Sequence, residues 1–300
     1  MKIAVSGLGR MGMQIARKLA ENGHEVVAHN RSRDPIDLAV TYGVTAAYTK
    51  EDLAKAFDGK QFVLWLMIPA DVVDDELESW IAIMPKGSTI IDGGNSDYRK
   101  TRERAKKLEK AGLYLLDSGT SGGVWGYQNG FSMMVGGAQE AFSAVEDIFK
   151  TLSLPTGGYK YFGGPGSGHY VKMVHNAIEY GMMQSLAEGY RMLKEGPYKN
   201  LDLAAAGEVW QQGSVVQSWL NELTRQALVE NPMLEGIDGY VSESGEARWT
   251  IETAKDLGIP LPAIEASFDV RIASQNGETN FATQLLSAMR NKFGGHNLNK

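Results

Sequence analysis

One short segment carries a set of side chains that could perform acid–base chemistry. Four polar residues follow one another at i, i+3, i+4 and i+7, which places them on one stripe of an α-helix: Lys172, His175, Asn176 and Glu179. A base, two hydrogen-bonding groups and an acid are what general acid–base catalysis requires. An exposed Lys–Glu face would show the same spacing, so the rest of the chain must decide between the two interpretations.

The N-terminal segment predicts a nucleotide-binding loop. A short apolar strand at 2–6 runs directly into Gly7-Leu-Gly-Arg-Met-Gly12, and a helical pattern follows from about Met11 to Glu21. In this context the first glycine makes a tight turn, the second lets a pyrophosphate approach the backbone, and the third lets helix and strand pack closely. The helix N-terminus offers N–H groups to the phosphates. Glycine loops also form plain turns, but the strand–loop–helix order favours a dinucleotide.

The turn after the second strand, 25–28, indicates which dinucleotide binds. An acidic residue is expected there when NAD is bound, because it accepts the ribose 2′-OH. Asn30 occupies that place instead, followed by Arg31, Ser32 and Arg33. Guanidinium and hydroxyl groups suit a 2′-phosphate. A solvated basic turn is the alternative; we expect NADP, with NAD possible.

Strands and helices alternate through the first half. Apolar strands are predicted near 44–48, 62–67, 88–92 and 113–117, and helical patterns fill 50–57, 71–83 and 97–111. This alternation is typical of a doubly wound, Rossmann-type α/β sheet, whose site lies at the carboxyl ends of the strands. The loops expected there are 68–70, 92–96 and 117–123. The last two are rich in glycine and carry amide and hydroxyl groups, so a binding role is favoured over simple turns.

Composition limits the class of protein. The 300 residues are about two domains' worth, 43% of them are hydrophobic, and the net charge of −6 argues against a general nucleic-acid binder. The longest apolar run, 62–70, is too short to span a bilayer. There are no cysteines, and the five histidines lack close-paired spacing, so we expect no disulfide and no metal site. The first strand leaves no room for a signal peptide, and we expect a cytoplasmic protein.

The second half changes character. After a strand near 131–135 and a helix at 138–152, a Pro- and Gly-rich stretch leads into an almost wholly helical pattern that begins with a helix at about 167–195. We therefore expect a cofactor-binding domain at 1–164 and an all-α substrate-binding and dimerisation domain at 165–300. The segment 290–296 ends in two glycines and a histidine, which suits an arm reaching a second subunit better than a packed helix end.

Taken together, these motifs resemble those of 6-phosphogluconate dehydrogenase, the decarboxylating enzyme, in its short bacterial form. The resemblance runs over the whole chain and rests on Gly7–Gly12, Asn30-Arg31, 92–96, 121–123 and, most specifically, Lys-Met-Val-His-Asn-Ala-Ile-Glu-Tyr at 172–180. Trp249-Thr250, 268–271 and 290–296 follow the family's order and spacing. Related β-hydroxyacid dehydrogenases resemble the segment after the lysine poorly.

The resemblance implies an activity and a role for each site residue. It implies oxidative decarboxylation of 6-phosphogluconate to ribulose 5-phosphate and CO2 with reduction of NADP, in the pentose phosphate pathway, by a homodimer or tetramer. Lys172 is the implied base and Glu179 the implied acid. The implied substrate ligands are Asn95, Ser121, Gly122, Gly123, His175, Asn176, Tyr180 and Arg271, with Arg290 and His296 from a second subunit. The implied cofactor contacts are Gly7, Leu8, Gly9, Arg10, Met11, Gly12, Asn30, Arg31, Ser32, Met67 and Asn95.

Two departures from the family pattern concern the substrate. Longer members place a phosphate-binding lysine where this chain has Ser244, and the nearby Glu246 would repel a phosphate, with Arg248 as a compensating charge. Val124-Trp125-Gly126 stands where longer members carry acidic residues. A β-hydroxyacid dehydrogenase, or a decarboxylating dehydrogenase of another sugar acid, is therefore the alternative enzyme. A non-catalytic dinucleotide sensor is the third hypothesis, and the intact Lys172/Glu179 pair argues against it.

Overall fold

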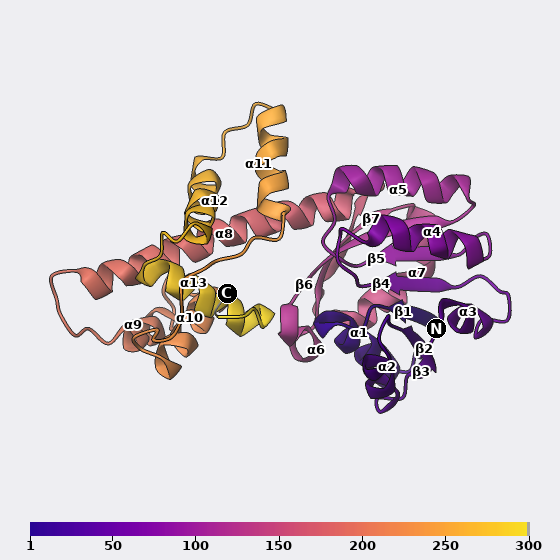
Figure 1. Cartoon of the computed structure of the whole chain (residues 1–300), viewed down its shortest axis with the longest axis horizontal. Coiled ribbons are helices and arrows are strands. Elements are labelled where there is room, and N and C mark those ends of the chain that lie inside the picture. Colours follow the sequence, from indigo (N-terminus) through magenta and orange to yellow (C-terminus); the bar gives the residue numbers. More distant parts are fainter. Residues whose placement is uncertain (299–300) are drawn as a thin grey trace. The chain divides into compact units, whose positions relative to one another are not determined.

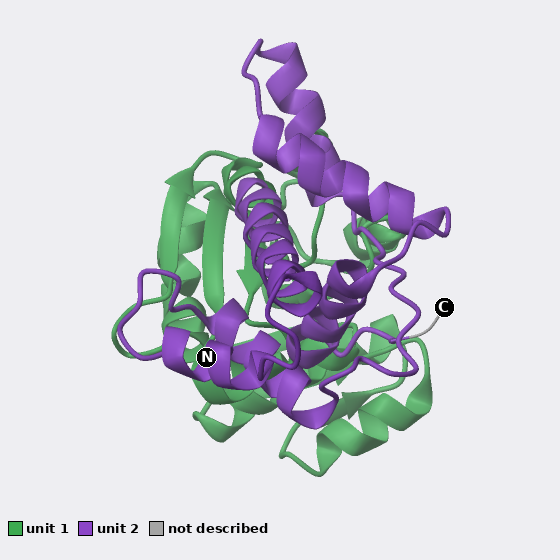
Figure 2. Cartoon of the chain, turned by 90° about the vertical axis from the view of Figure 1, so that its left-hand side faces the viewer, with its two compact units in different colours: residues 1–173 green, residues 174–300 purple. Residues whose placement is uncertain are grey.

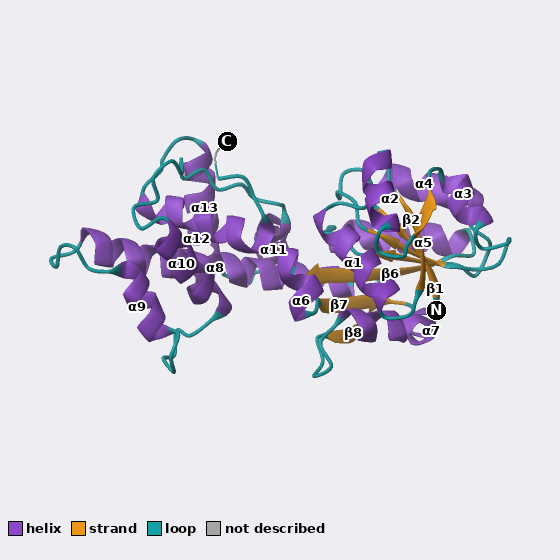
Figure 3. Cartoon of the chain, turned by 90° about the horizontal axis from the view of Figure 1, so that it is seen from below, coloured by secondary structure: helices purple, strands orange, loops and turns teal. Residues whose placement is uncertain are grey.

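The structure, a computed structural model, describes residues 1–298 and divides into two compact units. Unit 1 comprises Met1–Met173 and unit 2 comprises Val174–Lys300 (Figure 2). Unit 1 combines strands and helices, whereas the regular structure described in unit 2 is helical (Figure 3). The α/β fold followed by an all-α part is confirmed. No helix among the described residues has the length and apolar character needed to cross a membrane.

Unit 1 is built on one sheet (Figure 1). Its strands are in the order β3-β2-β1-β4-β5-β6-β7-β8. Neighbouring strands are parallel except β6 and β7, which are antiparallel. The strands are β1 (Lys2–Ser6), β2 (Glu25–His29), β3 (Thr45–Ala47), β4 (Val63–Leu66), β5 (Thr89–Asp92), β6 (Tyr114–Ser121), β7 (Ser132–Gly137) and β8 (Tyr159–Gly163). The helices are α1 (Arg10–Glu21), α2 (Arg33–Val40), α3 (Lys50–Lys55), α4 (Val73–Ile83), α5 (Tyr98–Lys110), the 3₁₀ turn η1 (Gly123–Trp125), α6 (Gly126–Asn129) and α7 (Gln139–Leu152).

Alternate residues of the strands feed two separate cores. Ile3 and Val5 of β1 pack with residues of α1, α2 and α7, whereas Ala4 between them packs with residues of α3, α4 and α5. Both faces of the sheet are therefore covered, as the near-continuous apolar strands predict for a parallel sheet. The register pairs Ser6 with His29 on one side and with Leu66 on the other, so the loops that follow these strands meet at one edge.

Three local predictions were incomplete. Helix α2 was not predicted, because Pro35 and the charges around it resemble a turn, although Ile36 and Ala39 bury one face of it. Strand β8 was also not predicted; it lies at the edge of the sheet and has no fully buried residue. The segment 117–121 was expected as a loop and is instead the end of β6, because it pairs with β7 up to the contact of Ser121 with Ser132.

Unit 2 consists of helices around the long helix α8 (Ser167–Glu195) from Val174 onwards. Within the described part of the chain the others are α9 (Leu203–Trp210), α10 (Trp219–Glu230), α11 (Glu246–Asp256), α12 (Pro262–Gln275) and α13 (Phe281–Gly294). Met183 and Tyr190 of α8 join Leu228 of α10 and Leu285 of α13 in the main core. A smaller cluster joins Ala177 and other α8 residues to the start of α11 and to α12.

Candidate active site

The glycine loop after β1 has the geometry of a dinucleotide site. Gly7 has a φ of +95°, and a Cβ there would overlap the carbonyl oxygen of Met67. A Cβ at Gly12 would overlap the carbonyl oxygen of Gly7, so helix α1 packs directly on the turn. A Cβ at Gly9, by contrast, would meet no atom within 4 Å. Gly7 and Gly12 thus serve the fold, and Gly9 leaves room for a ligand to approach the backbone.

The N-terminus of α1 suits an anion. Its N-cap is Gly9, which offers no side-chain cap, and the first turn carries no acidic residue. The backbone N–H groups of this turn therefore point towards the loop without a carboxylate competing for them. Leu8 is 4% exposed, so its side chain belongs to the core and only its backbone can face a ligand.

Asn30 fastens the glycine loop to the turn after β2. Its side-chain oxygen accepts a hydrogen bond from the backbone N–H of Leu8 at 2.9 Å. Its amide nitrogen donates to the hydroxyl of Ser32 at 2.9 Å. The asparagine therefore holds two of the predicted cofactor segments together. A carboxylate in its place could accept the bond from Leu8 but could not donate one to Ser32.

The two arginines of this turn have different surroundings. Arg33 lies over the ring of Tyr48, 4.6 Å from its centroid, and its Nε is 3.4 Å from a carboxylate oxygen of Asp37. Arg31 is exposed. The sequence treated both as possible ligands of a 2′-phosphate, but the structure engages Arg33 within α2 and its neighbourhood. Arg31 is the better candidate.

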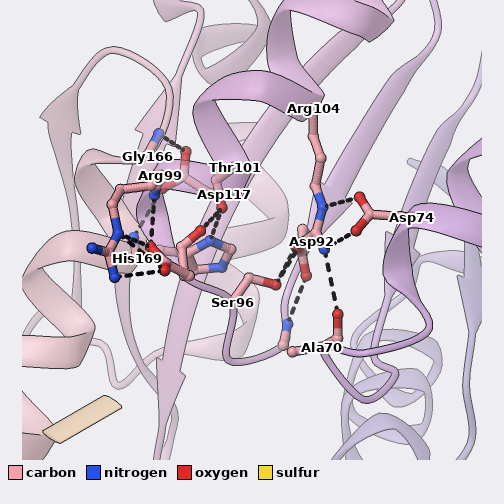
Figure 4. A network of polar contacts seen from close by, with 12 residues as sticks. Ala70, Asp74, Asp92, Ser96, Arg99, Thr101, Arg104, Asp117, Gly166 and His169 are labelled. Atoms are coloured by element: carbon pink, nitrogen blue, oxygen red, sulfur yellow. Dashed lines mark hydrogen bonds and ion pairs between the residues drawn. The ribbon is translucent and has the colours of Figure 1, made fainter. Parts of the chain in front are cut away.

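A buried network holds the loop after β5 (Figure 4). Asp92 accepts hydrogen bonds from the N–H of Gly94 at 3.2 Å and from the hydroxyl of Ser96 at 2.8 Å. Arg104 of α5, 3% exposed, donates to Ser96 and forms an ion pair with Asp74 of α4 at 2.7 Å. The network connects two helices to the loop, and the bonds satisfy the buried charges.

The same loop passes close to the sheet. A Cβ at Gly93 would overlap the indole of Trp65 on β4. Asn95, between this glycine pair and the anchored Ser96, is half-buried. The sequence predicted the binding role of Asn95, but the buried Arg104 that supports the loop was missed, because its helix looks like an exposed basic helix.

Asp117 of β6 positions the start of α8, as Figure 4 also shows. This carboxylate is fully buried and accepts hydrogen bonds from the backbone N–H groups of Gly166 at 2.8 Å and His169 at 2.9 Å. A carboxylate at a helix N-terminus satisfies N–H groups and is stabilised by the helix dipole. The His169 ring is within 2.8 Å of the Thr101 hydroxyl, which adds a link to α5. Sequence reasoning missed this role, because nothing near Asp117 in the chain announces a helix cap fifty residues later.

Lys172 is fixed by this arrangement. It lies just over one turn from the capped end of α8 and is only 5% exposed. A Cβ at Gly119 of β6 would overlap the side chain of Lys172, so glycine is required for the helix to pack this closely. Ser121 ends the same strand, and Gly122 follows with a φ of +126°. Within unit 1, β6 thus supports the predicted base and leads directly into the predicted Ser-Gly-Gly substrate segment.

The other members of the polar stripe lie in unit 2. His175 Nδ1 is 3.0 Å from the side-chain oxygen of Asn176 and 3.9 Å from a carboxylate oxygen of Glu179. Asn176 donates from its amide nitrogen to Glu246 at 2.7 Å. Glu246 also accepts a hydrogen bond from the Ser244 hydroxyl at 2.6 Å. The bland interpretation of an exposed charged face is wrong for Lys172 and Asn176, which are both buried.

Two buried arginines form a basic cluster with Tyr180. Arg271 is 1% exposed and its guanidinium lies 3.2 Å from the centroid of the Tyr180 ring. Arg290 is 7% exposed and donates to the hydroxyl of Ser242 at 2.8 Å. Among residues 1–298 no carboxylate oxygen lies within 4.0 Å of either guanidinium, and the buried Tyr180 hydroxyl has no hydrogen-bond partner. Burial lowers the pKa of Arg271 to about 10 and also lowers the pKa of Arg290.

This cluster has the chemistry to bind an anion. Buried charges are normally paired, and buried hydroxyls are normally hydrogen-bonded. Two guanidiniums and one phenol without such partners would all be satisfied by one phosphate, which accepts several hydrogen bonds and carries the opposite charge. The structure therefore brings together three of the residues that the sequence assigned to the substrate phosphate: Tyr180, Arg271 and Arg290.

The prediction of a C-terminal arm was wrong for its first part. Arg290 to Gly294 are the last residues of α13, and Arg290 points into unit 2 of its own chain. Gly295, which has a φ of +61°, caps the end of the helix. The backbone oxygen of the next residue, His296, accepts a hydrogen bond from the side chain of Asn291 at 2.7 Å. The basic residues looked like a frayed tail, but the apolar face that buries α13 extends to its end.

The compensating role considered for Arg248 was also wrong. Its guanidinium donates to Glu243 at 2.6 Å and lies 5.2 Å from the ring centroid of Phe268. Its charge is therefore already paired on the surface. Arg290, and not Arg248, supplies the second positive charge beside Arg271.

Both parts of the chain match family models. Residues 2–161 match the NAD binding domain of 6-phosphogluconate dehydrogenase, and residues 168–293 match the C-terminal domain of 6-phosphogluconate dehydrogenase. The chain belongs to the 6-phosphogluconate dehydrogenase family. The identification first made from the helix motif is thereby confirmed.

Individual relatives carry the name of the same family. The chain is 37% identical to the NAD(+)-dependent, decarboxylating 6-phosphogluconate dehydrogenase of Haloferax volcanii over 99% of this chain and 98% of that protein. It is 35% identical to the decarboxylating enzyme of Haemophilus influenzae over 95% of this chain, but it spans only 62% of that longer protein. The solved Plasmodium falciparum 6-phosphogluconate dehydrogenase superposes with a TM-score of 0.84 at 29% identity, covering 96% of this chain and 70% of that one.

Proposed function

We propose that this protein is an NAD(P)-dependent 6-phosphogluconate dehydrogenase. It converts 6-phosphogluconate to ribulose 5-phosphate and CO2, a reaction of the pentose phosphate pathway. The observation that carries the proposal is the basic cluster of Tyr180, Arg271 and Arg290, because a phosphate would pair with its two buried guanidiniums and accept a hydrogen bond from its unpartnered phenol. A β-hydroxyacid dehydrogenase acting on an unphosphorylated acid would have no use for this cluster.

The catalytic roles follow from the chemistry of the substrate, which has a hydroxyl at C3, β to its carboxylate. Lys172 removes the proton from this hydroxyl; when bound, the dinucleotide supplies the hydride acceptor. The resulting β-keto acid loses CO2, and the protonated Lys172 stabilises the negative charge that develops on the ketone oxygen. Glu179 then donates a proton to C1 of the enediol. Burial of Lys172 keeps water away from the proton transfer.

The remaining residues bind the substrate. The phosphate ligands are Tyr180, Arg271 and Arg290, with His296 from a second subunit. The hydroxyls and the carboxylate are held by Asn95, Ser121, Gly122, Gly123, His175 and Asn176. We propose 1–164 as the cofactor domain and 165–300 as the substrate domain, since α8, which carries the acid–base residues, begins at Ser167.

The cofactor fits the loop at the edge of unit 1. The proposed contacts are Gly7, Leu8, Gly9, Arg10, Met11, Gly12, Asn30, Arg31, Ser32, Met67 and Asn95. We propose NADP as the preferred form, because the turn after β2 offers the exposed Arg31 and no carboxylate at the position of Asn30. The NAD(+)-dependent relative shows that the family also uses NAD. We therefore assign the cofactor choice of each member to the turn after its second strand.

We further propose a cytoplasmic homodimer, in which unit 2 forms the interface. Ile178 and Met182 lie one turn apart on α8 and are 51% and 46% exposed. Apolar side chains in this pattern favour contact with another helix. Sedimentation should give twice the mass of the chain, and Ile178→Asp should shift the protein towards monomer. A single-chain mass for the wild type would contradict the proposal, whereas four times the mass would extend it to a tetramer.

One assay tests the activity. The protein is incubated with 6-phosphogluconate and either NADP or NAD, and reduced cofactor and CO2 are measured together. We expect equal amounts of both products, faster turnover with NADP, and little turnover of gluconate without its phosphate. Arg248→Met, which removes an arginine already paired on the surface, is the control. Equal rates with gluconate and 6-phosphogluconate would favour the β-hydroxyacid dehydrogenase alternative.

A further inference from the structure

Glu246 stands out in unit 2 because it is a buried carboxylate that the proposed reaction does not use. It is the first residue of α11 and only 1% exposed. One of its oxygens accepts a hydrogen bond from the Asn176 amide at 2.7 Å, and the other accepts one from the Ser244 hydroxyl at 2.6 Å. A buried carboxylate is tolerated when it is hydrogen-bonded and lies at a helix N-terminus. Both conditions hold here.

The carboxylate dictates the orientation of Asn176. An ionised carboxylate only accepts hydrogen bonds, so the group that faces it must be the NH2 of the asparagine and not its oxygen. With its nitrogen directed at Glu246, Asn176 turns its oxygen towards the side chain of the preceding residue of α8.

That side chain is His175. Its Nδ1 lies 3.0 Å from the Asn176 oxygen, and the nearest Glu179 oxygen is 3.9 Å from the same nitrogen. Both neighbours are acceptors, so Nδ1 must carry the hydrogen. In the neutral imidazole Nε2 is then an acceptor. The hydrogen bonds thus connect Glu246 to Asn176 and Asn176 to His175. Because Glu246 only accepts hydrogen bonds, this connection leaves Nε2 of His175 without a hydrogen.

We propose that Glu246 is a positioning residue that sets the tautomer of His175, so that Nε2 accepts a hydrogen bond from a hydroxyl of the substrate. The inference rests on the proposed function for the identity of that hydroxyl. It reverses the effect expected from sequence, in which Glu246 repels the phosphate. The carboxylate instead accepts hydrogen bonds from Asn176 and Ser244. Its effect on the sugar hydroxyls is indirect, through the tautomer of His175.

The tautomer can be measured directly. Full-length protein labelled with 15N histidine gives ring nitrogen shifts that separate an N–H from a lone-pair nitrogen, and a His175→Asn variant assigns the signals. The wild type should show the hydrogen on Nδ1. In Glu246→Ala the Asn176 amide can rotate, and the population with the hydrogen on Nε2 should rise. Glu246→Gln keeps an oxygen that can face Asn176 and should retain the wild-type tautomer. Ser244→Ala removes the other bond of the same carboxylate and should also retain it.

Kinetics give the second readout. Glu246→Ala should lower kcat/KM for 6-phosphogluconate about tenfold, the effect of one lost hydrogen bond, without changing the KM for the cofactor. Glu246→Gln should restore most of it. Hydrogen on Nε2 of His175 in the wild type, or an unchanged tautomer in Glu246→Ala, would overturn the inference. The spectrum needs no turnover, so a wild type inactive on 6-phosphogluconate would refute the proposed function separately.

Discussion

Replacing Arg271 by methionine should separate substrate binding from stability. Burial lowers the pKa of this guanidinium from the ordinary arginine value to about 10. Near neutral pH the group is charged both folded and unfolded, and the lower folded pKa means that its burial opposes folding. The difference corresponds to about 3 kcal/mol at ~1.4 kcal/mol per pKa unit. This destabilisation is fully present below the folded pKa and disappears as the pH rises above about 10 towards the ordinary pKa of arginine.

Other contacts offset part of this cost. The guanidinium lies 3.2 Å from the Tyr180 ring centroid, and a desolvated cation–π contact contributes about 2 kcal/mol. Methionine fills much of the same volume without a charge. We therefore expect Arg271→Met, in the absence of substrate, to be at least as stable as the wild type in a denaturant titration. Replacement of buried charges by apolar residues is often neutral or stabilising.

Substrate should reveal what the arginine is for. Loss of one member of a buried charge pair costs about 2–5 kcal/mol, so kcat/KM for 6-phosphogluconate should fall about 30-fold or more. At a concentration ~100 times its Kd, the substrate should stabilise the wild type by about 2.7 kcal/mol, and the same concentration should barely stabilise the variant. The surface variant Arg248→Met controls for the loss of an arginine. If Arg271→Met is destabilised by several kcal/mol while its KM is unchanged, Arg271 is structural and the phosphate assignment is wrong.

Three further predictions concern the catalytic helix and the cofactor. Lys172→Ala should abolish oxidation, and Glu179→Gln should lower turnover ~10²–10⁴-fold at the protonation step, with cofactor binding retained in both; near-normal turnover of the lysine variant in the coupled assay would contradict the mechanism. Arg31→Ala should weaken NADP by about 2 kcal/mol in a fluorescence titration and leave NAD almost unchanged, whereas equal kcat/KM for both cofactors in the wild type would show that the turn does not select. Gly9→Ala should fold normally and lose cofactor affinity, because a Cβ there meets only the open space where the cofactor would approach. Gly12→Ala should lower the melting temperature, because its Cβ would overlap backbone. The reverse pattern would mean that the two glycines have exchanged roles.

Local patterns determined much of this protein. Apolar runs of strand length, alternating with amphipathic helices, specify a parallel sheet covered on both faces, since the helices bury both sides of such strands. The order strand, Gly7 to Gly12, helix specifies a phosphate-binding turn, because its requirements lie within a few residues of one another. The stripe from Lys172 to Glu179 could be recognised for the same reason. One helical turn brings its members together whatever the rest of the chain does.

Only the tertiary structure decided how distant residues act on these motifs. Asp117 caps a helix that begins fifty residues later, and Arg104 supports a loop from the helix that follows it. Arg290 looked like part of a tail but is buried at the end of a packed helix beside Tyr180 and Arg271. Glu246 looked like a charge that repels substrate, and the fold pairs it with Asn176, seventy residues away. The sequence determines the sign of each charge. The effect of that charge on stability and binding depends on its partners and on its exposure to water, and packing determines both.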